Sequence, residues 1–410
     1  MRDREVTFSG AAGHPLSARL SGPLDGRVRA CALFAHCFTC SKDLKPVKNI
    51  TRALTQAGIA VLRFDFTGLG ESGGDFGDTT FSSNIGDLLA AARYLEQEME
   101  GPAILVGHSL GGAAVLSAAA QIESCRAVAT IGAPFDPAHV THLFGDRIPD
   151  IEAEGDADVT IAGRTFSVSR EFLRDIEGRR VDETLAELRL PLLLFHSPVD
   201  RVVGIENAAK LYAAARHPKS FISLDDADHL LLAERDSLYV GNVLAAWAGR
   251  YLEDRPEAAS GTHAPERDGP VSARTEAGEG FLTEILARGH AILADEPASV
   301  GGSDLGPTPY DLLAAALGAC TTMTLQMYAR RKGWPLREAS VRVEHQRLHR
   351  KDQEEACLDR EPRLDSLHRE VRLEGPLDEA QRARLLEIAD RCPVHRTLSA
   401  GVVIETRTAP

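Results

Sequence analysis

The stretch AILVGHSLGG, residues 103–112, decides the fold of the larger part of this 410-residue chain. It joins a short apolar run, typical of a buried strand, to the small-residue helix pattern GGAAVLSAAA. The Gly-x-Ser-x-Gly sequence between them allows a tight strand-to-helix turn, which pushes the hydroxyl of Ser109 out at the carboxyl edge of a sheet. At the same place, the N-terminus of the helix offers backbone N–H groups to an anion.

Similar apolar runs alternate with amphipathic helix patterns on both sides of this turn. The alternation predicts an α/β fold with a mostly parallel sheet covered by helices on both faces. Two earlier runs, residues 5–10 and 15–20, are expected to pair as an antiparallel edge. An insert over residues 139–189 interrupts the alternation and predicts a small cap with a hairpin within residues 151–169. The main strands are expected within residues 30–36, 59–66, 103–108, 127–135, 191–197 and 220–224.

Two further residues with catalytic chemistry follow predicted strands of this sheet. Asp200 comes after the run LLLFHSPV, where a carboxylate can orient an imidazole, and His229 comes after FISLDDAD. Together with Ser109 they stand at the C-terminal ends of three separate strands, in the chain order Ser, Asp, His. This arrangement predicts a Ser-His-Asp catalytic triad.

Residues 1–253 resemble the α/β-hydrolase family. Beyond the triad, the resemblance depends on two stretches. HCFTCSKD (36–43) stands where the family has His-Gly-x-x-Gly, and RFDFTGLGESGG (63–74) is similar to its Asp-x-x-Gly-x-Gly-x-Ser loop. The resemblance implies that Ser109 is the nucleophile of a serine hydrolase of the carboxylesterase type.

The same resemblance implies a role for each remaining residue of the site. His229 would be the base, and Asp200 would hold its imidazole. Leu110 and Phe38 would donate their backbone N–H groups to the oxyanion. Cys37 departs from the family pattern, because it stands at the usual Gly position.

Cys37 and Cys40 form a Cys-x-x-Cys sequence. Such a sequence can be a redox or metal-binding pair. It can also be two small side chains in a loop beside the active site. The second interpretation is favoured, because no further Cys or His pair nearby completes four zinc ligands.

Residues 254–270 are rich in Pro, Gly, Ala and charged residues and are expected to form a linker. The segment after it, residues 271–410, predicts an α+β domain with strands, a long apolar helix from Pro309, two shorter helices and a final strand at VVIETRTAP. Because that long helix is apolar nearly all round, it must be buried on most sides. A domain of this size has little material to cover it, which predicts a homodimer.

GGSDLGPTPYDLLAAALGAC, followed later by RCPVHRTL, is similar to the OsmC/organic-hydroperoxide-resistance family over residues 271–410. The family's members are thiol-dependent peroxidases and intertwined homodimers. The resemblance implies that Cys320 attacks an organic hydroperoxide as the peroxidatic cysteine, that Cys392 is the resolving cysteine, and that a dithiol reduces their disulfide. The activating cation is left open among three arginines: Arg274, Arg288 and Arg396.

Composition excludes several other classes of protein. The net charge of −14 argues against a nucleic-acid surface. The N-terminal sequence MRDREVTFSG has no apolar core of a secretory signal, and no uninterrupted apolar run approaches a membrane span. Seven cysteines without dense spacing fit a cytoplasmic, mostly reduced chain. No dinucleotide-binding motif or metal cluster is found, so no cofactor or metal is expected.

The sequence therefore predicts a serine hydrolase of small acyl esters or thioesters, fused to a domain that reduces organic hydroperoxides. A peptidase role for the first part stays open. In the alternative hypothesis only the hydrolase is active, and the second domain is a dimerisation scaffold or a redox sensor.

Overall fold

The computed structural model describes residues 2–37, 40–161, 164–177, 181–252, 271–276, 280–348 and 364–408. Phe38 and the expected linker at 254–270 lie outside these described residues. The chain divides into two compact units. The first comprises Met1–Gly269 with Arg288–Ala291, and the second comprises Pro270–Ala287 with Ile292–Pro410.

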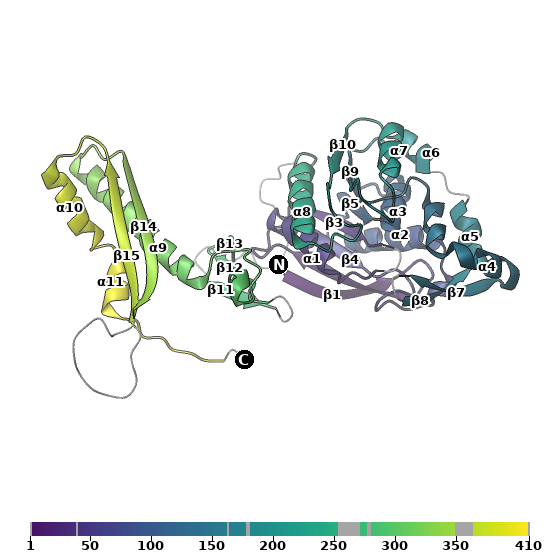
Figure 1. Ribbon diagram of the computed structural model, residues 1–410, viewed down its shortest axis with the longest axis horizontal. Coiled ribbons are helices and arrows are strands. Elements are labelled where there is room, and N and C mark those ends of the chain that lie inside the picture. Colours follow the sequence, from purple (N-terminus) through teal and green to yellow (C-terminus); the bar gives the residue numbers. More distant parts are fainter. Residues whose placement is uncertain are drawn as a thin grey trace. The chain divides into compact units, whose positions relative to one another are not determined.

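An eight-stranded sheet forms the centre of the first unit (Figure 1). An antiparallel pair, β1 and β2, lies at one edge, and the six remaining strands run parallel to one another. The predicted parallel sheet with an antiparallel edge is therefore confirmed. In sheet order the strands are β1 (Arg2–Ser9), β2 (Pro15–Gly22), β4 (Ile59–Phe64), β3 (Ala30–Ala35), β5 (Ile104–His108), β6 (Ala127–Ile131), β9 (Leu192–His196) and β10 (Lys219–Ser223).

Helices cover both faces of this sheet, because side chains of each central strand alternate between two apolar cores. In β3, Leu33 packs into one core and Phe34 into the other. The core around Leu33 also contains apolar side chains of three helices: α2 (Phe81–Glu98), α3 (Leu110–Ala118) and α7 (Glu206–Ala214). The core around Phe34 is closed by α1 (Lys45–Gln56) and α8 (Glu234–Gly249).

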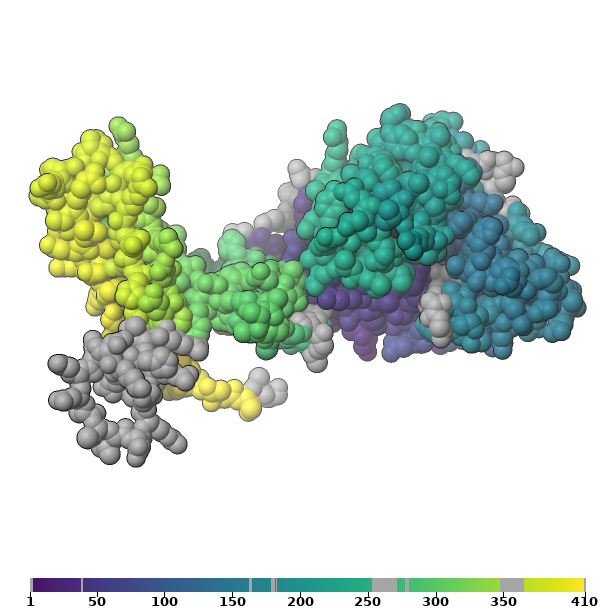
Figure 2. All heavy atoms as spheres, viewed as in Figure 1, coloured from purple at the N-terminus to yellow at the C-terminus, as the bar shows by residue number. Residues whose placement is uncertain are grey.

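An insert between β6 and β9 forms a lobe at one end of the first unit (Figure 2). It begins with the 3₁₀ segment η3 (Pro137–Arg147) and the helix α4 (Ile148–Glu154). The antiparallel hairpin of β7 (Asp156–Ile161) and β8 (Arg164–Ser169) follows, as the sequence predicted. The helices α5 (Arg170–Glu177) and α6 (Val181–Glu187) lead back to the sheet.

The second unit is built from strands and helices in mixed order. A three-stranded sheet comes first, with the strands β11 (Ser272–Thr275), β12 (Thr283–Ala287) and β13 (His290–Ala294), and the first two residues of β13 belong to the first unit. The long helix α9 (Pro309–Lys332) then packs on an antiparallel ribbon of β14 (Glu338–Leu348) and β15 (Leu364–Glu374). The helices α10 (Glu379–Ala389) and α11 (Pro393–Ala400) pack on α9. Three short 3₁₀ turns complete the described elements: η1 (Phe76–Asp78), η2 (Ala119–Gln121) and η4 (Ala298–Val300).

The helix α9 begins and ends at strong helix signals. Thr308 and Asp311 form a reciprocal capping box at its start, and Gly333 adopts a left-handed conformation at its end. Between them lies an 18-residue window with a mean hydropathy of 1.3, of which 28% is buried. By length and composition α9 is apolar enough to cross a membrane. The sequence did not predict this, because it contains no long uninterrupted apolar run. A core helix passes the same test, so this remains weak evidence for a membrane span.

The final strand expected at residues 402–410 is absent from the described part of the chain. Residues 401–408 have no regular secondary structure, and Val403 and Ile404 are 89% and 84% exposed. The residues have strand-forming character, but a strand requires hydrogen bonds to a neighbouring backbone. Within a single chain this segment has no such partner among the described strands.

Candidate active site

Ser109 lies on a sharp turn between β5 and α3. Its backbone has a positive φ of 55°, an unfavourable conformation for a residue with a side chain. The turn is possible because glycines stand two residues before and two residues after Ser109. A Cβ atom on Gly107 would lie 2.3 Å from the Gly111 carbonyl, and one on Gly111 would lie 2.4 Å from the His36 carbonyl. The strained turn presents the hydroxyl of Ser109 at the carboxyl edge of the sheet.

Two side chains from other strand ends form a hydrogen-bonded chain that begins at this hydroxyl. His229 Nε2 lies 2.9 Å from Ser109 Oγ, and His229 Nδ1 lies 2.7 Å from Asp200 Oδ2. Asp200 follows β9 and His229 follows β10, as the sequence predicted. In this arrangement the imidazole can take the proton of the hydroxyl while the carboxylate stabilises the imidazolium.

Asp200 is held as a carboxylate by its surroundings. Its Oδ1 accepts hydrogen bonds from the backbone N–H groups of Val202 and Val203, at 2.8 and 2.9 Å. Burial favours the neutral acid, but these bonds and the one to His229 keep the pKa of Asp200 below its usual value. Gly132 lies under the pair, since a Cβ there would be 3.3 Å from both Asp200 and His229.

His108 fixes the position of His229 through a hydrogen bond to its backbone. Burial, together with the neighbouring His229, lowers the pKa of His108 to about 3, so its ring is neutral at pH 7. Its Nε2 lies 2.7 Å from the backbone oxygen of His229. Because a carbonyl only accepts, Nε2 carries the proton and donates to it.

The oxyanion side of the site begins at the N-terminus of α3. Leu110 is the first residue of that helix and is 4% exposed. Its backbone N–H precedes the first intrahelical hydrogen bond, so it is available to an anion. The second predicted donor, Phe38, lies outside the described residues. Cys37 and Cys40 are joined by a disulfide, so they are a bonded pair and not merely two small side chains in a loop, the interpretation that the sequence favoured.

A buried ion pair holds the loop after β3 at Lys42. Lys42 Nζ donates to Asp65 Oδ2 at 2.8 Å and to Glu71 at 2.7 Å, and the Lys42 backbone N–H donates to Asp65 Oδ1 at 2.7 Å. The Lys42 and Asp65 side chains are only 2% and 1% exposed. Burial disfavours the ammonium, but the two carboxylates hold the pKa of Lys42 above its ordinary value. The pair therefore joins the loop after β3 to the loop after β4.

In the second unit, the predicted cysteines lie on different elements and are both free thiols. Cys320 is half-buried on α9. Cys392 is fully buried at the start of α11, where its Sγ accepts the backbone N–H of His395 at 3.3 Å. Cys392 Sγ also lies 3.6 Å from the hydroxyl of Thr321, the residue after Cys320.

Arg369 connects to this pair through Thr321. Its guanidinium donates to Thr321 Oγ1 at 3.0 Å and to Asp390 at 2.6 Å. The Thr321 hydroxyl donates its hydrogen bond to the carbonyl of Leu317. The Cys392 thiol is therefore the donor toward Thr321. The Thr321 hydroxyl thus lies between the Arg369 guanidinium and the Cys392 sulfur.

Comparison with protein-family models assigns both units. A model described as the alpha/beta hydrolase family matches residues 32–301, about two thirds of the chain. The chain belongs to the alpha/beta hydrolase family. A second model, described as an OsmC-like protein, matches residues 301–407. The predicted fusion of a hydrolase with an OsmC-like domain is therefore confirmed.

Known relatives of the hydrolase unit include esterases. The crystal structure of the esterase domain from a Rhodothermus marinus protein is 52% identical, with a TM-score of 0.52, and covers 62% of this chain and 100% of that domain. The protein YfhR of Salmonella typhi is 26% identical over 227 residues, 55% of this chain and 74% of the relative. The mitochondrial palmitoyl-protein thioesterase ABHD10 of Mus musculus is 30% identical over 154 residues, 36% of this chain and 50% of the relative.

Several polar residues of both sites were not singled out from the sequence. In the hydrolase unit these are His108 and Lys42, although both stand inside the quoted motifs. In the OsmC-like unit Arg369 occupies the place near the cysteines, whereas Arg274 pairs with Glu276. Of the other two candidates, Arg288 lies in the turn between β12 and β13, and Arg396 is exposed on α11. Within the described residues, no group of three or more His, Cys, Asp or Glu is placed to hold a metal ion.

Proposed function

We propose that the hydrolase unit cleaves acyl esters or thioesters by a Ser-His-Asp mechanism. The observation that carries the proposal is the continuous hydrogen-bonded chain from Ser109 through His229 to Asp200, with distances of 2.9 and 2.7 Å. The Rhodothermus marinus esterase domain and the mouse thioesterase support the two substrate classes.

The first half of the reaction forms an acyl-enzyme. Ser109 Oγ attacks the substrate carbonyl while His229 Nε2 takes its proton, and the carbonyl π pair moves onto the oxygen. That oxyanion accepts the N–H of Leu110, and such a donor contributes about 3–4 kcal/mol in comparable sites. Collapse of the intermediate breaks the bond to the alkoxide or thiolate, which leaves with the proton from His229.

The second half returns the enzyme to its starting state. Water loses a proton to His229 and attacks the ester of Ser109. The tetrahedral intermediate then expels Ser109 Oγ, which recovers the proton, and the acid product leaves. Throughout, Asp200 stabilises the imidazolium without taking its proton.

A fluorophosphonate probe on the full chain tests the nucleophile directly. We expect mass spectrometry to find one phosphonylated residue, Ser109, and labelling to abolish hydrolysis of p-nitrophenyl esters in proportion to its extent. A labelled protein with full esterase activity, or labelling elsewhere with Ser109 intact, would overturn the proposal.

We further propose that the OsmC-like unit is a thiol peroxidase that works as a homodimer. The contact of Cys392 with Thr321, the residue after Cys320, supports a disulfide between the two cysteines. The exposed Met323 and Met327 on α9, at 65% and 72%, support a second copy as the cover of this face.

The peroxidase chemistry uses one thiolate at a time. Cys320 attacks the O–O bond of an organic hydroperoxide, becomes a sulfenic acid and releases the alcohol after protonation. The Cys392 thiol displaces that hydroxyl as water and forms a Cys320–Cys392 disulfide. An external dithiol then reduces the disulfide and is oxidised in turn.

Mass spectrometry after stoichiometric cumene hydroperoxide distinguishes this activity from its alternatives. We expect a Cys320–Cys392 disulfide in the wild type and a trapped sulfenic acid on Cys320 in Cys392→Ser. Oxidation of Cys320 without turnover by a dithiol would favour a redox sensor. A fully reduced Cys320 would leave this unit as a dimerisation scaffold.

A further inference from the structure

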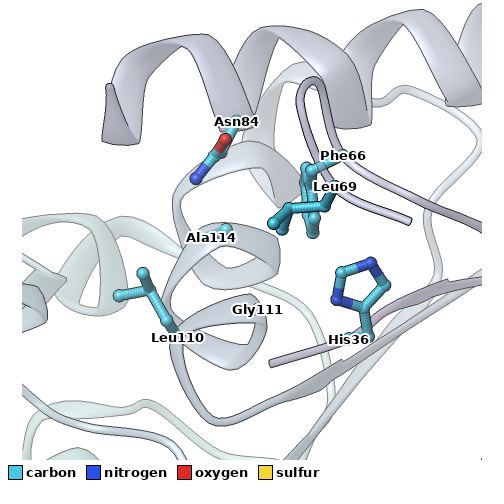
Figure 3. Close-up of a pocket in the computed structure, with 7 residues that line it drawn as sticks. All are labelled: His36, Phe66, Leu69, Asn84, Leu110, Gly111 and Ala114. Atoms are coloured by element: carbon cyan, nitrogen blue, oxygen red, sulfur yellow. The ribbon is translucent and has the colours of Figure 1, made fainter. Parts of the chain in front are cut away.

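A small pocket lies against the first turn of α3, immediately after Ser109 (Figure 3). Leu110, Gly111 and Ala114 of α3 form one wall, and the end of β3, the loop after β4 and the start of α2 close the rest. The space open to a water-sized sphere is about 10 Å³. That volume accepts one water molecule or one oxygen-bearing group of a substrate.

Asn84 lines this pocket with an unpartnered carboxamide. Its side chain descends from α2 toward α3 (Figure 3), and the residue is 8% exposed. The backbone N–H of Asn84 bonds the Thr80 carbonyl. Within the described residues, however, its carboxamide has no hydrogen-bond partner. The helix does not need it for capping either, since Thr80 and Ser83 cap α2.

Other buried asparagines of the hydrolase unit are bonded within the protein. The Asn49 amide donates to Ser237 at 2.9 Å, and the Asn207 amide bonds the backbone of Phe135 and Gly204. The carboxamide atoms of Asn84 are not among the fully buried atoms that lack a partner, so a group that enters the pocket can reach them. Asn also disfavours a helix interior. A partner supplied by the substrate would offset that cost at Asn84.

We propose that Asn84 is a specificity-determining residue that binds a hydroxyl group on the acyl part of the substrate. The preferred substrates are then short 2- or 3-hydroxyacyl esters or thioesters. Leu110 and Gly111 line the pocket, so a group that enters it is attached close to the carbonyl that Ser109 attacks. This inference rests on the proposed function of Ser109.

A hydroxyl group matches the chemistry of the pocket. It donates to Asn84 Oδ1 and accepts from Nδ2, whereas an unsubstituted acyl chain leaves both atoms unpaired. His36 supplies a further buried acceptor. Burial lowers the pKa of His36, and its Nδ1 bonds the Cys37 carbonyl, so Nε2 carries a lone pair. Among the described residues Nε2 has no hydrogen-bond partner, and Asp65 lies at 3.6 Å.

Matched methyl esters test the proposal on the full chain. Methyl lactate and methyl propionate differ only by the 2-hydroxyl, as methyl 3-hydroxybutyrate and methyl butyrate differ by the 3-hydroxyl. For each pair, the ratio of kcat/KM for the hydroxy ester to kcat/KM for its partner is divided by the same ratio for alkaline hydrolysis, which gives the enzymatic excess. We expect an excess of about 10-fold or more for at least one pair, because the unsubstituted ester leaves one amide unpaired. Asn84→Leu should bring this excess close to 1.

Asn49→Leu is the matched control, because it makes the same change at a buried asparagine on the opposite face of the sheet. It should lower stability and leave the excess unchanged. If Asn84→Leu does not fold, Asn84→Ala should show the same loss of preference. The proposal is overturned if the wild type shows no excess for either pair, or if the Asn84 variants slow all esters equally.

Failure of the proposed function gives a different result. In that case Ser109→Ala would hydrolyse p-nitrophenyl acetate as fast as the wild type. A wild type that cleaves this ester through Ser109 without preferring hydroxy esters overturns the assignment of Asn84 alone.

Discussion

The hydrolase unit and the OsmC-like unit differ in how much of a site one chain provides. In the hydrolase unit, three strand ends of one sheet bring Ser109, His229 and Asp200 into a hydrogen-bonded chain, in which the side chains of His229 and Asp200 are 8% and 2% exposed. In the OsmC-like unit, Cys392 is buried, but Cys320 is half-buried on a helix with an exposed apolar face. A parallel sheet gathers its strand ends at one edge, whereas a small α+β unit has too little chain to enclose a 24-residue apolar helix.

If the two sites are independent, disabling one should leave the other intact. We expect Ser109→Ala to lower kcat for ester hydrolysis about 10³-fold or more, because triad members act as a unit. Peroxide consumption by the same protein should be unchanged. Both assays on one preparation check this, with Cys320→Ser as the reciprocal control. A parallel loss of both activities would contradict the separation of the sites.

The buried charges of the hydrolase unit should matter beyond stability. In Lys42→Met the carboxylate of Asp65 loses its buried cation, and the loop that begins at His36 is no longer held. We expect kcat to fall up to about 100-fold, the size of effect that a misplaced catalytic group produces, with KM nearly unchanged. Steady-state kinetics below the unfolding temperature measure both values.

Lys45→Met is the control for this prediction. Lys45 is an exposed lysine that pairs with Glu234 at 3.0 Å, so its loss should have little effect on either constant. A Lys42→Met protein with full kcat and only a lower melting temperature would make the buried pair a purely structural feature.

The open face of α9 gives the third test. In Met327→Glu a charge is placed on the stripe that we propose a second copy covers, so the dimer should dissociate. We expect the dissociation constant to rise roughly 30-fold or more, the effect of about 2 kcal/mol at an interface. Light scattering at micromolar concentration measures the change.

Tyr239→Glu provides a comparison in the hydrolase unit, since Tyr239 is 49% exposed on α8. It should leave the dimer intact. A wild-type chain that is monomeric at micromolar concentration would sink the prediction and leave the α9 face without an assigned cover.

The hydrolase site was more predictable from sequence than the cysteine site. Ser109, Asp200 and His229 each follow an apolar strand, and the geometry of a parallel sheet brings such residues together. Arg369 carries no comparable signal, because it is one of many charged residues on strands whose polar and apolar residues alternate. Only the register of β14 and β15 places it beside Thr321. The Cys37–Cys40 disulfide depends on the path of a loop, which residue spacing does not determine.

The smallest expected effect comes from a histidine that the closed site keeps neutral. In the folded hydrolase the pKa of His108 is about 3, against an unfolded value near 6.5. Between these values the unfolded chain binds the extra proton, so the stability present above pH 6.5 falls as the pH falls toward 3. The loss from His108 between pH 7.5 and 5.5 is on the order of 1 kcal/mol. We expect His108→Gln, which keeps a donor toward the His229 carbonyl, to lack that loss.

The two tryptophans allow this prediction to be tested in each unit separately. Trp247 lies on α8 of the hydrolase unit, and Trp334 lies just after α9 in the OsmC-like unit. In Trp334→Phe the remaining Trp247 reports the unfolding of the hydrolase unit by its fluorescence, and in Trp247→Phe the remaining Trp334 reports that of the OsmC-like unit. Urea unfolding of each variant is followed at pH 7.5 and 5.5. The described histidines of the OsmC-like unit are half-buried or exposed, so His108→Gln should leave its acid response unchanged. If the free energy of unfolding of the hydrolase unit depends on pH in the same way with and without His108, the prediction is wrong. The buried ring would then not destabilise the folded unit in acid, and the difference between the two units would not extend to their pH dependence.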